Sequence, residues 1–170
     1  MPLTPFHLGP GLFFGLIFKK LSLLPFLLGS VILDIEPLSV IIYNRNYSYY
    51  SYPHHGILHS LFGAFLASLL IAIILNNFKN FFTKFKIGLF SKFIPSKEEG
   101  FLGLFFSAFL GCTLHLFFDS FMHYDVFPFW PSRFNPFLGL ISNSQNYFLC
   151  SILGILGLVL LIFKISKMRK

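Results

Sequence analysis

The stretch "GFLGLFFSAFLGCTLHLFFDSFM", residues Gly100–Met122, carries no charge before Asp119 and places His115 four residues ahead of that aspartate. A transmembrane helix needs about 20 apolar residues to cross the hydrocarbon core of a bilayer, and this stretch is long enough. Because four residues advance about 400° around an α-helix, His115 and Asp119 should share one face, which His123 joins if the helix persists that far. The stretch predicts a membrane-spanning helix with polar side chains near one end.

The composition of the whole chain points to the same solvent. Hydrophobic residues make up 55% of the 170 residues, charged residues only 11%, and the mean hydropathy is +0.75. Too few polar side chains remain to cover a water-soluble surface. We therefore expect an integral membrane protein with room for a single domain, residues 1–170.

Five apolar segments can be marked along the chain, and the first is too short to span a bilayer. Period-2 alternation, which marks the strands of membrane barrels, is absent from them, so helices are expected. The predicted fold is an all-α membrane bundle of about five helices, the first of half length. The segments are Leu8–Phe18, Ser22–Ile42, Ile57–Phe78, Gly100–Met122 and Tyr147–Phe163.

The basic residues predict the orientation of this bundle. The formal net charge is +7, and eleven of the thirteen Lys and Arg residues fall in the turn after the first segment, in the loop between the third and fourth, or in the C-terminal tail. Such clusters indicate cytoplasmic loops of a multi-pass protein of the cell membrane rather than a nucleic-acid-binding face. All six histidines and four of the six acidic residues then fall on the non-cytoplasmic side.

Three of those histidines open the third segment, in "HHGILHS" (54–60). His55 and His59 are four residues apart, so on a helix both imidazoles would lie on one face and could reach the same ion. His54 would lie in the preceding loop. His7, just ahead of the first segment, is a further candidate ligand from the same side.

Two carboxylates close the second segment, in "LDIEP" (33–37). Asp34 and Glu36 would diverge by about 200° on a regular helix, so both reach one site only if the helix distorts or ends near Pro37. An unpaired carboxylate within an apolar membrane segment costs about 2.5–3.5 kcal/mol. Asp34 therefore needs a partner, either a metal ion, an arginine, or a histidine paired directly without metal.

A divalent metal best explains this donor set. The cysteines, Cys112 and Cys150, lie apart within apolar segments and offer no thiolate pair, and imidazole with carboxylate suits Zn or Mn, and also Fe. The number of donors allows one ion or two, and paired ions are used for phosphoester hydrolysis. The candidate metal ligands are His7, Asp34, Glu36, His54, His55, His59, His115 and Asp119.

Four motifs occur in order over roughly residues 4 to 140: "GSVILDIEP" (29–37), "HHGILHS" (54–60), "HLFFDS" (115–120) and "PFWP" (128–131). Together they resemble the membrane-bound metal-dependent hydrolase family, also described as YdjM-like, LexA-binding inner-membrane hydrolases. The resemblance implies a helical integral membrane protein and a metal-dependent hydrolytic activity.

The resemblance carries over to individual positions. Asp34 matches the first acid of the family pattern, Glu36 stands where the second acid is usually Asp, and the "HLFFDS" motif supplies a matching His and Asp. In "HHGILHS", His54 and His59 match the two family histidines, and His55 stands where Arg is usual. Helical spacing favours His55 and the family pattern favours His54, so both stay candidates.

We therefore expect a metal-dependent hydrolase of a phosphoester, such as a lipid or lipid-linked phosphate, at the non-cytoplasmic membrane surface. Asp34 or Glu36, whichever is not a ligand, could accept a proton from water, and Arg133 could hold the phosphate. A non-catalytic protein that binds or transports a divalent metal is the alternative, as is a scaffold with a structural ion. Aromatic residues suited to the headgroup region flank these motifs at Tyr47, Tyr49, Tyr50, Tyr52 and Trp130.

Overall fold

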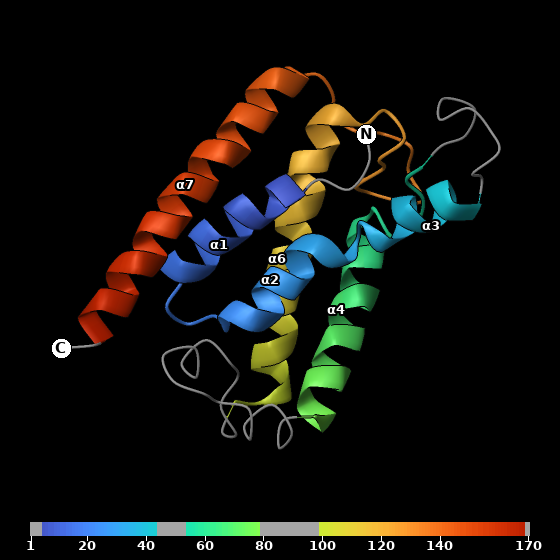
Figure 1. The fold of residues 1–170 in the computed structure, drawn as a ribbon. Coiled ribbons are helices and arrows are strands. Elements are labelled where there is room, and N and C mark those ends of the chain that lie inside the picture. The colour runs from blue at the N-terminus through green and yellow to red at the C-terminus, as the bar shows by residue number, and fades with distance from the viewer. Residues whose placement is uncertain (1–4, 44–53, 79–98, 169–170) are drawn as a thin grey trace.

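The computed structural model describes residues 5–43, 54–78 and 99–168, and within these ranges it contains helices and no strand, which confirms the all-α prediction (Figure 1). The elements are η1 (Pro5–His7), α1 (Leu8–Ile17), α2 (Leu23–Ile32), α3 (Ile35–Tyr43), α4 (Leu61–Asn77), α6 (Phe101–Met122) and α7 (Asn143–Met168).

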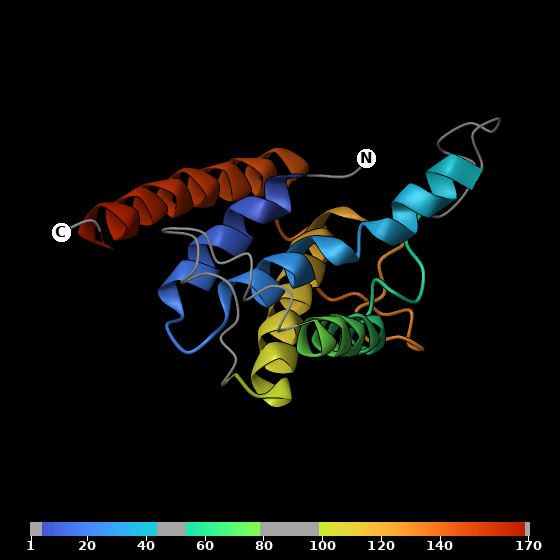
Figure 2. The same ribbon diagram turned by 60° about the horizontal axis from the view of Figure 1, so that its bottom comes forward.

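The helix α6 forms the centre of the bundle (Figures 1 and 2). Helices α2 and α4 pack against it, and α1 bridges from α2 to the outer helix α7. Three stretches are long and apolar enough to cross a membrane, namely Leu23–Tyr43, Phe101–Met122 and Asn143–Lys167. The helices α1 and α4 are apolar but shorter, as was predicted for the first segment.

Two glycines allow α2 and α6 to cross at backbone contact. A Cβ atom on Gly29 would lie 2.2 Å from the carbonyl oxygen of Ala108, and one on Gly111 would lie 2.1 Å from the carbonyl oxygen of Phe26. No side chain fits at either distance, so glycine is required at both positions. This close crossing brings the end of α2 directly beside the polar half of α6.

The second apolar segment is broken within its length. α2 ends at Ile32 and α3 starts at Ile35, with Leu33 and Asp34 in a turn between them. Pro37 does not cause the break, because it lies in the first turn of α3, where its missing N–H needs no partner. Beyond the turn, α3 points away from the bundle (Figures 1 and 2).

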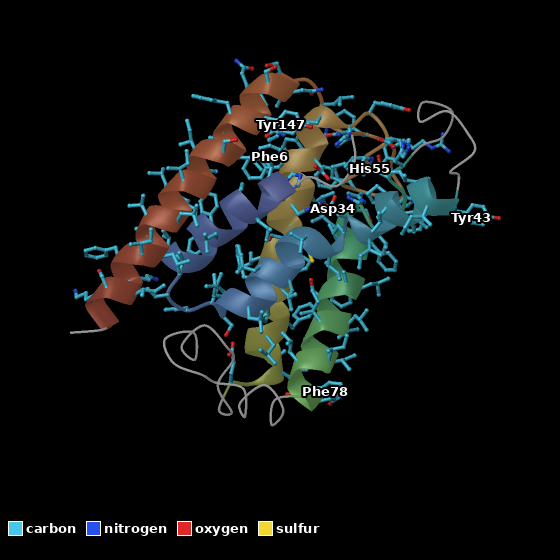
Figure 3. All side chains as sticks on the ribbon, viewed as in Figure 1. Phe6, Asp34, Tyr43, His55, Phe78 and Tyr147 are labelled. Carbon is cyan, nitrogen blue, oxygen red and sulfur yellow. The ribbon has the colours of Figure 1, made fainter. Side chains whose placement is uncertain are left out.

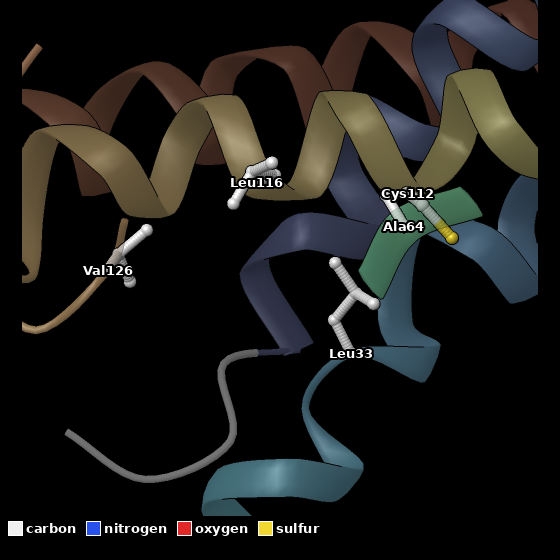
Figure 4. Close-up of a cluster of buried hydrophobic side chains, with 5 residues drawn as sticks. All are labelled: Leu33, Ala64, Cys112, Leu116 and Val126. Atoms are coloured by element: carbon white, nitrogen blue, oxygen red, sulfur yellow. The ribbon is translucent and has the colours of Figure 1, made fainter. Parts of the chain in front are cut away.

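A buried apolar cluster holds this turn in place (Figure 4). Leu33 is fully buried there, against residues from three other parts of the chain. Because Leu33 is anchored in the core, its neighbour Asp34 is held at the bundle and does not follow α3 outward. The cluster consists of Leu33, Ala64, Cys112, Leu116 and Val126.

The third helix begins later than predicted. Ser60 adopts an extended conformation and its hydroxyl accepts a hydrogen bond from the N–H of Gly63 at 3.1 Å, so it caps α4, which starts at Leu61. The expectation that His55 and His59 share a helical face is therefore wrong, since both precede the helix. The predicted Lys-rich loop, and Tyr47, Tyr49, Tyr50 and Tyr52, lie outside the described residues.

Candidate metal centre

Four side chains converge where the α2–α3 turn meets α6. Asp34, His59, His115 and Asp119 each place one ligand atom within 4.8 Å of the others. His115 Nε2 lies 3.1 Å from Asp119 Oδ2 and 3.8 Å from Asp34 Oδ1, and His59 Nε2 lies 3.5 Å from Asp119 Oδ2. In Figure 3, Asp34 lies toward the end of the bundle opposite Phe78, the residue that follows α4. We call these four residues the first cluster.

Two nitrogen atoms of the first cluster have no hydrogen-bond partner. His59 Nε2 and His115 Nε2 are both buried and, although carboxylate oxygens are near, none is placed to accept a hydrogen bond from them. Nearly all buried polar atoms in proteins do have such a partner. A metal ion bound by both nitrogens would satisfy them, and the two carboxylates would balance its charge.

The orientation of His115 is set by the close helix crossing. Its Nδ1 lies 2.8 Å from the backbone carbonyl oxygen of Ser30, which can only accept, so Nδ1 carries the proton. This leaves Nε2 as the free electron-pair donor, directed at Asp119 and Asp34. A second bond that fixes the tautomer in this way is the usual companion of a metal-binding histidine.

Glu36 performs the equivalent task for His59. Its Oε2 lies 2.8 Å from His59 Nδ1, and the carboxylate also accepts the backbone N–H groups of Leu58 and His59 at 3.1 and 3.2 Å. Glu36 thus contacts the Nδ1 side of the His59 ring, away from Nε2, and is not a member of the first cluster. The break between α2 and α3 is what allows Asp34 and Glu36 to act on the same histidine-rich region despite their spacing.

His7 reaches the site from η1, as its position in the sequence suggested. Its Nε2 lies 2.8 Å from Asp119 Oδ1, and the side chain is 4% exposed. Its ring packs on that of His115, with centroids 4.4 Å apart. His7 therefore contacts Asp119, the carboxylate that also faces His59 and His115, and holds its Oδ1 in place.

A second cluster adjoins the first and consists of His55, His123 and Asp125. Asp125 accepts the backbone N–H groups of His54 and His55 at 2.7 and 3.0 Å, and its Oδ1 lies 3.0 Å from His55 Nδ1. The side chain of His54 belongs to neither cluster. The sequence analysis grouped His123 and Asp125 with the other histidines and acids on one side of the membrane. It did not include them among the candidate metal ligands, although both follow the "HLFFDS" motif closely.

Charge is strongly concentrated around the first cluster. Burial lowers the pKa of His7, but the nearby carboxylate of Asp119 outweighs it, so that the pKa is raised. Burial also opposes a charged His59, yet Asp119 and Glu36 raise its pKa to about 9. His123 is different, because burial prevails and lowers its pKa to about 4. The carboxylates around His59 thus create a negative field that either a proton or a divalent cation would neutralise.

The loop after α6 covers this end of the bundle. The side-chain amide of Asn135 donates to the carbonyl oxygens of Ser120 and Val126 at 2.9 and 3.2 Å, which ties the loop to the end of α6. Arg133 is exposed in this loop, and Trp130 is 42% exposed. Arg133 therefore lies at the surface, in the loop that follows α6, rather than inside the site.

An all-helical bundle with three stretches able to span a membrane, and with buried histidines and carboxylates at one end, defines an integral membrane protein with a candidate metal centre. A family model described as YdjM inner membrane protein matches residues 3–169, and the chain belongs to this family. The YdjM-like resemblance of the sequence motifs is thus confirmed, as is a membrane location. Comparisons with curated proteins and with solved structures gave no match.

Proposed function

We propose that the protein is a membrane-bound metal-dependent hydrolase whose first cluster holds a divalent ion. The observation that carries this proposal is the pair of buried imidazole nitrogens without hydrogen-bond partners, His59 Nε2 and His115 Nε2, which face the carboxylates of Asp34 and Asp119. Two imidazoles and two carboxylates, with no thiolate, suit Zn or Mn. When bound, such an ion supplies Lewis acidity that activates water near neutral pH and polarises an ester.

Asp34 is the residue of the first cluster best placed to meet a substrate. Its side chain is 12% exposed, against 3% or less for the other three, and it makes no hydrogen bond to any residue in the described ranges. Glu36, by contrast, already accepts three hydrogen bonds from His59 and its neighbour. Asp34 is therefore our choice as the group that accepts a proton from water, which leaves His59, His115 and Asp119 as the ligands of the ion. Glu36 positions His59.

The surroundings of the site support a lipid as the substrate. An apolar cavity of about 280 Å³ lies between α1 and α7, and its lining includes Phe6 and Leu8, the two neighbours of His7 in the chain. An acyl or polyprenyl chain in this cavity would place a headgroup near the histidines. Arg133, exposed in the covering loop, would bind the phosphate of such a headgroup by charge-assisted hydrogen bonds.

The experiment combines metal analysis with a lipid assay. Protein purified in detergent is analysed for bound metal by mass spectrometry, beside His59→Ala and Asp119→Ala. It is then mixed with vesicles that contain phosphatidic acid or a polyprenyl diphosphate, with Mn²⁺ or Zn²⁺, and released phosphate is measured. We expect stoichiometric metal in the wild type only, and phosphate release that Asp34→Asn abolishes. Wild-type protein without metal would overturn the proposal, and metal without release from either lipid would refute the lipid substrate.

One observation favours a second function, the transport of a divalent ion. Transporters bind their ions at discontinuous membrane helices, and Asp34 lies in such a break between α2 and α3. Proteoliposomes loaded with a Mn²⁺-quenched dye distinguish the two functions. Uptake of Mn²⁺ that Asp119→Ala abolishes, in protein that hydrolyses no lipid, would establish transport instead of hydrolysis.

A further inference from the structure

The second cluster lies against the first through a continuous row of imidazoles. Ring centroids are 5.5 Å apart for His115 and His59, 4.5 Å for His59 and His55, and 4.3 Å for His55 and His123. Imidazole nitrogens are common ligands of divalent metal ions in proteins. The row therefore extends the set of closely spaced imidazole side chains beyond the first cluster, as far as His123.

The carboxylate of Asp119 lies between the two clusters. Its Oδ2 faces His59 and His115, and its Oδ1 faces His7 at 2.8 Å and His123 at 3.9 Å. The two oxygens of one carboxylate thus face different sets of imidazoles. A carboxylate in this position can contact two neighbouring cations at once.

His55 and Asp125 repeat the arrangement of His59 and Glu36. In each pair the carboxylate contacts the histidine's Nδ1 and also accepts two consecutive backbone N–H groups, one of them the histidine's own. The same device therefore holds two histidines at this end of the bundle. One of them, His59, belongs to the first cluster.

The contact between His55 and Asp125 is explained by a structural role, because it holds the loop. Such a role does not explain why a third polar side chain, His123, lies beside them. His123 follows the last residue of α6 in extended conformation, and its side chain is only 16% exposed. Its Nε2 lies 3.9 Å from Asp119 Oδ1, too far for a hydrogen bond. The ring of His123 packs against that of His55, and a cation held by His55 and Asp125 would be within reach of its nitrogens.

We propose that His55, His123 and Asp125 hold a second divalent cation, beside the ion proposed for the first cluster, with the carboxylate of Asp119 between the two. This inference rests on the proposed function, because the two cations share Asp119. Each of the three residues places a ligand atom within 4.8 Å of the others, as in the first cluster. Paired cations about 3.5–4 Å apart are typical of enzymes that cleave phosphoesters.

Manganese stoichiometry and electron paramagnetic resonance test the second cation without reference to activity. Detergent-purified protein is dialysed against Mn²⁺, and bound metal is counted per chain. We expect two Mn²⁺ and an exchange-coupled spectrum from the wild type. His123→Gln should bind one Mn²⁺ and give the six-line spectrum of an isolated ion. Tyr124→Phe, an exposed neighbour outside both clusters, is the matched control and should behave as the wild type.

The outcomes separate this inference from the proposed function. One Mn²⁺ per chain in both wild type and His123→Gln, with uncoupled spectra, would overturn the second cation and leave the first intact. No Mn²⁺ or Zn²⁺ in the wild type would overturn both. Should His123→Gln fail to fold, judged by its elution and melting temperature, the wild-type spectrum alone decides, since an uncoupled signal excludes paired ions.

Discussion

The backbone carbonyl oxygen of Ser30 lies 2.8 Å from Nδ1 of His115, and this contact joins the packing of two helices to the chemistry of the site. It exists because Gly29 and Gly111 let α2 and α6 cross at backbone distance. The tautomer of His115, and so the direction of its free nitrogen, depends on a helix crossing that involves no ligand residue.

Gly29→Ala should therefore damage both stability and metal binding. Its Cβ would lie 2.2 Å from a backbone carbonyl oxygen, and overpacking of this kind costs about 1–3 kcal/mol. We expect a lower melting temperature in detergent and weaker Mn²⁺ binding. Gly103→Ala is the control on the same helix pair, because its Cβ would meet nothing closer than 3.5 Å. Equal metal affinity in both variants would contradict the link between crossing and site.

Glu36→Gln should weaken metal binding without abolishing it. The amide loses the negative charge that faces His59 Nδ1, and loss of such a supporting carboxylate typically lowers metal affinity about 10–100-fold. Calorimetric titration with Mn²⁺ measures the change. Ser39→Ala, which removes an exposed hydroxyl bonded to the Glu36 carbonyl, should leave affinity unchanged. If Glu36→Gln lost no affinity, the carboxylate would have no part in positioning His59.

The choice between His54 and His55 can be resolved by metal counting. His54 contributes its backbone N–H to Asp125, and its side chain lies outside both clusters, whereas His55 belongs to the second. We expect His54→Gln to retain two Mn²⁺ per chain and His55→Gln to retain one. The reverse result would show that the family pattern, which favours His54, is the better guide to the ligand.

Arg133→Ala should affect the recognition of substrate and spare the metal. Arg133 is exposed and belongs to neither cluster, so metal content should not change. Loss of a charge-assisted hydrogen bond of about 1.5 kcal/mol would raise KM for a phosphorylated lipid roughly tenfold. Arg133→Lys, which keeps the charge, should recover part of this loss. An unchanged KM for Arg133→Ala would remove the residue from the substrate site.

Cysteine labelling in intact cells tests the orientation proposed from the basic residues. Lys19 lies in the turn between α1 and α2, and Tyr124 lies 70% exposed near the candidate centre. The native cysteines, Cys112 and Cys150, are buried and should not react. We expect an impermeant maleimide to label Tyr124→Cys from outside the cytoplasm and Lys19→Cys only after the membrane is permeabilised. If Lys19→Cys were labelled in intact cells and Tyr124→Cys only after permeabilisation, the orientation would be the reverse of the one proposed.

The sequence predicted the helices well where hydropathy alone decides them. The first apolar segment, Leu8–Phe18, corresponds to α1 at Leu8–Ile17, and Gly100–Met122 corresponds to α6 at Phe101–Met122. The fifth helix is longer than predicted at both ends. Its polar first turn is held by Asn146, whose side chain donates to the carbonyl oxygen of Phe118 at 2.9 Å. Hydropathy does not register such tertiary anchors.

The site was harder to predict because its geometry comes from breaks and caps. His55 and His59 lie in the loop that ends at Ser60, ahead of α4. Their positions are therefore set by carboxylates of other segments, Asp125 for His55 and Glu36 for His59, and not by helical periodicity. His115 and Asp119, one turn apart on α6, are the pair that spacing predicted directly, and their side chains do lie 3.1 Å apart. The break that frees Asp34 depends on the burial of Leu33, a tertiary effect that local sequence does not reveal.

The outward direction of α3 has a mechanical consequence for the interior. Glu36, in the first turn of α3, holds the ring and backbone of His59, while the rest of the helix extends away from the bundle (Figure 2). Whatever tilts α3, whether a lipid, a partner or a change in the bilayer, must also move the support of a buried imidazole. A movement of α3 would thus change the position of His59, a candidate metal ligand, through the contact with Glu36.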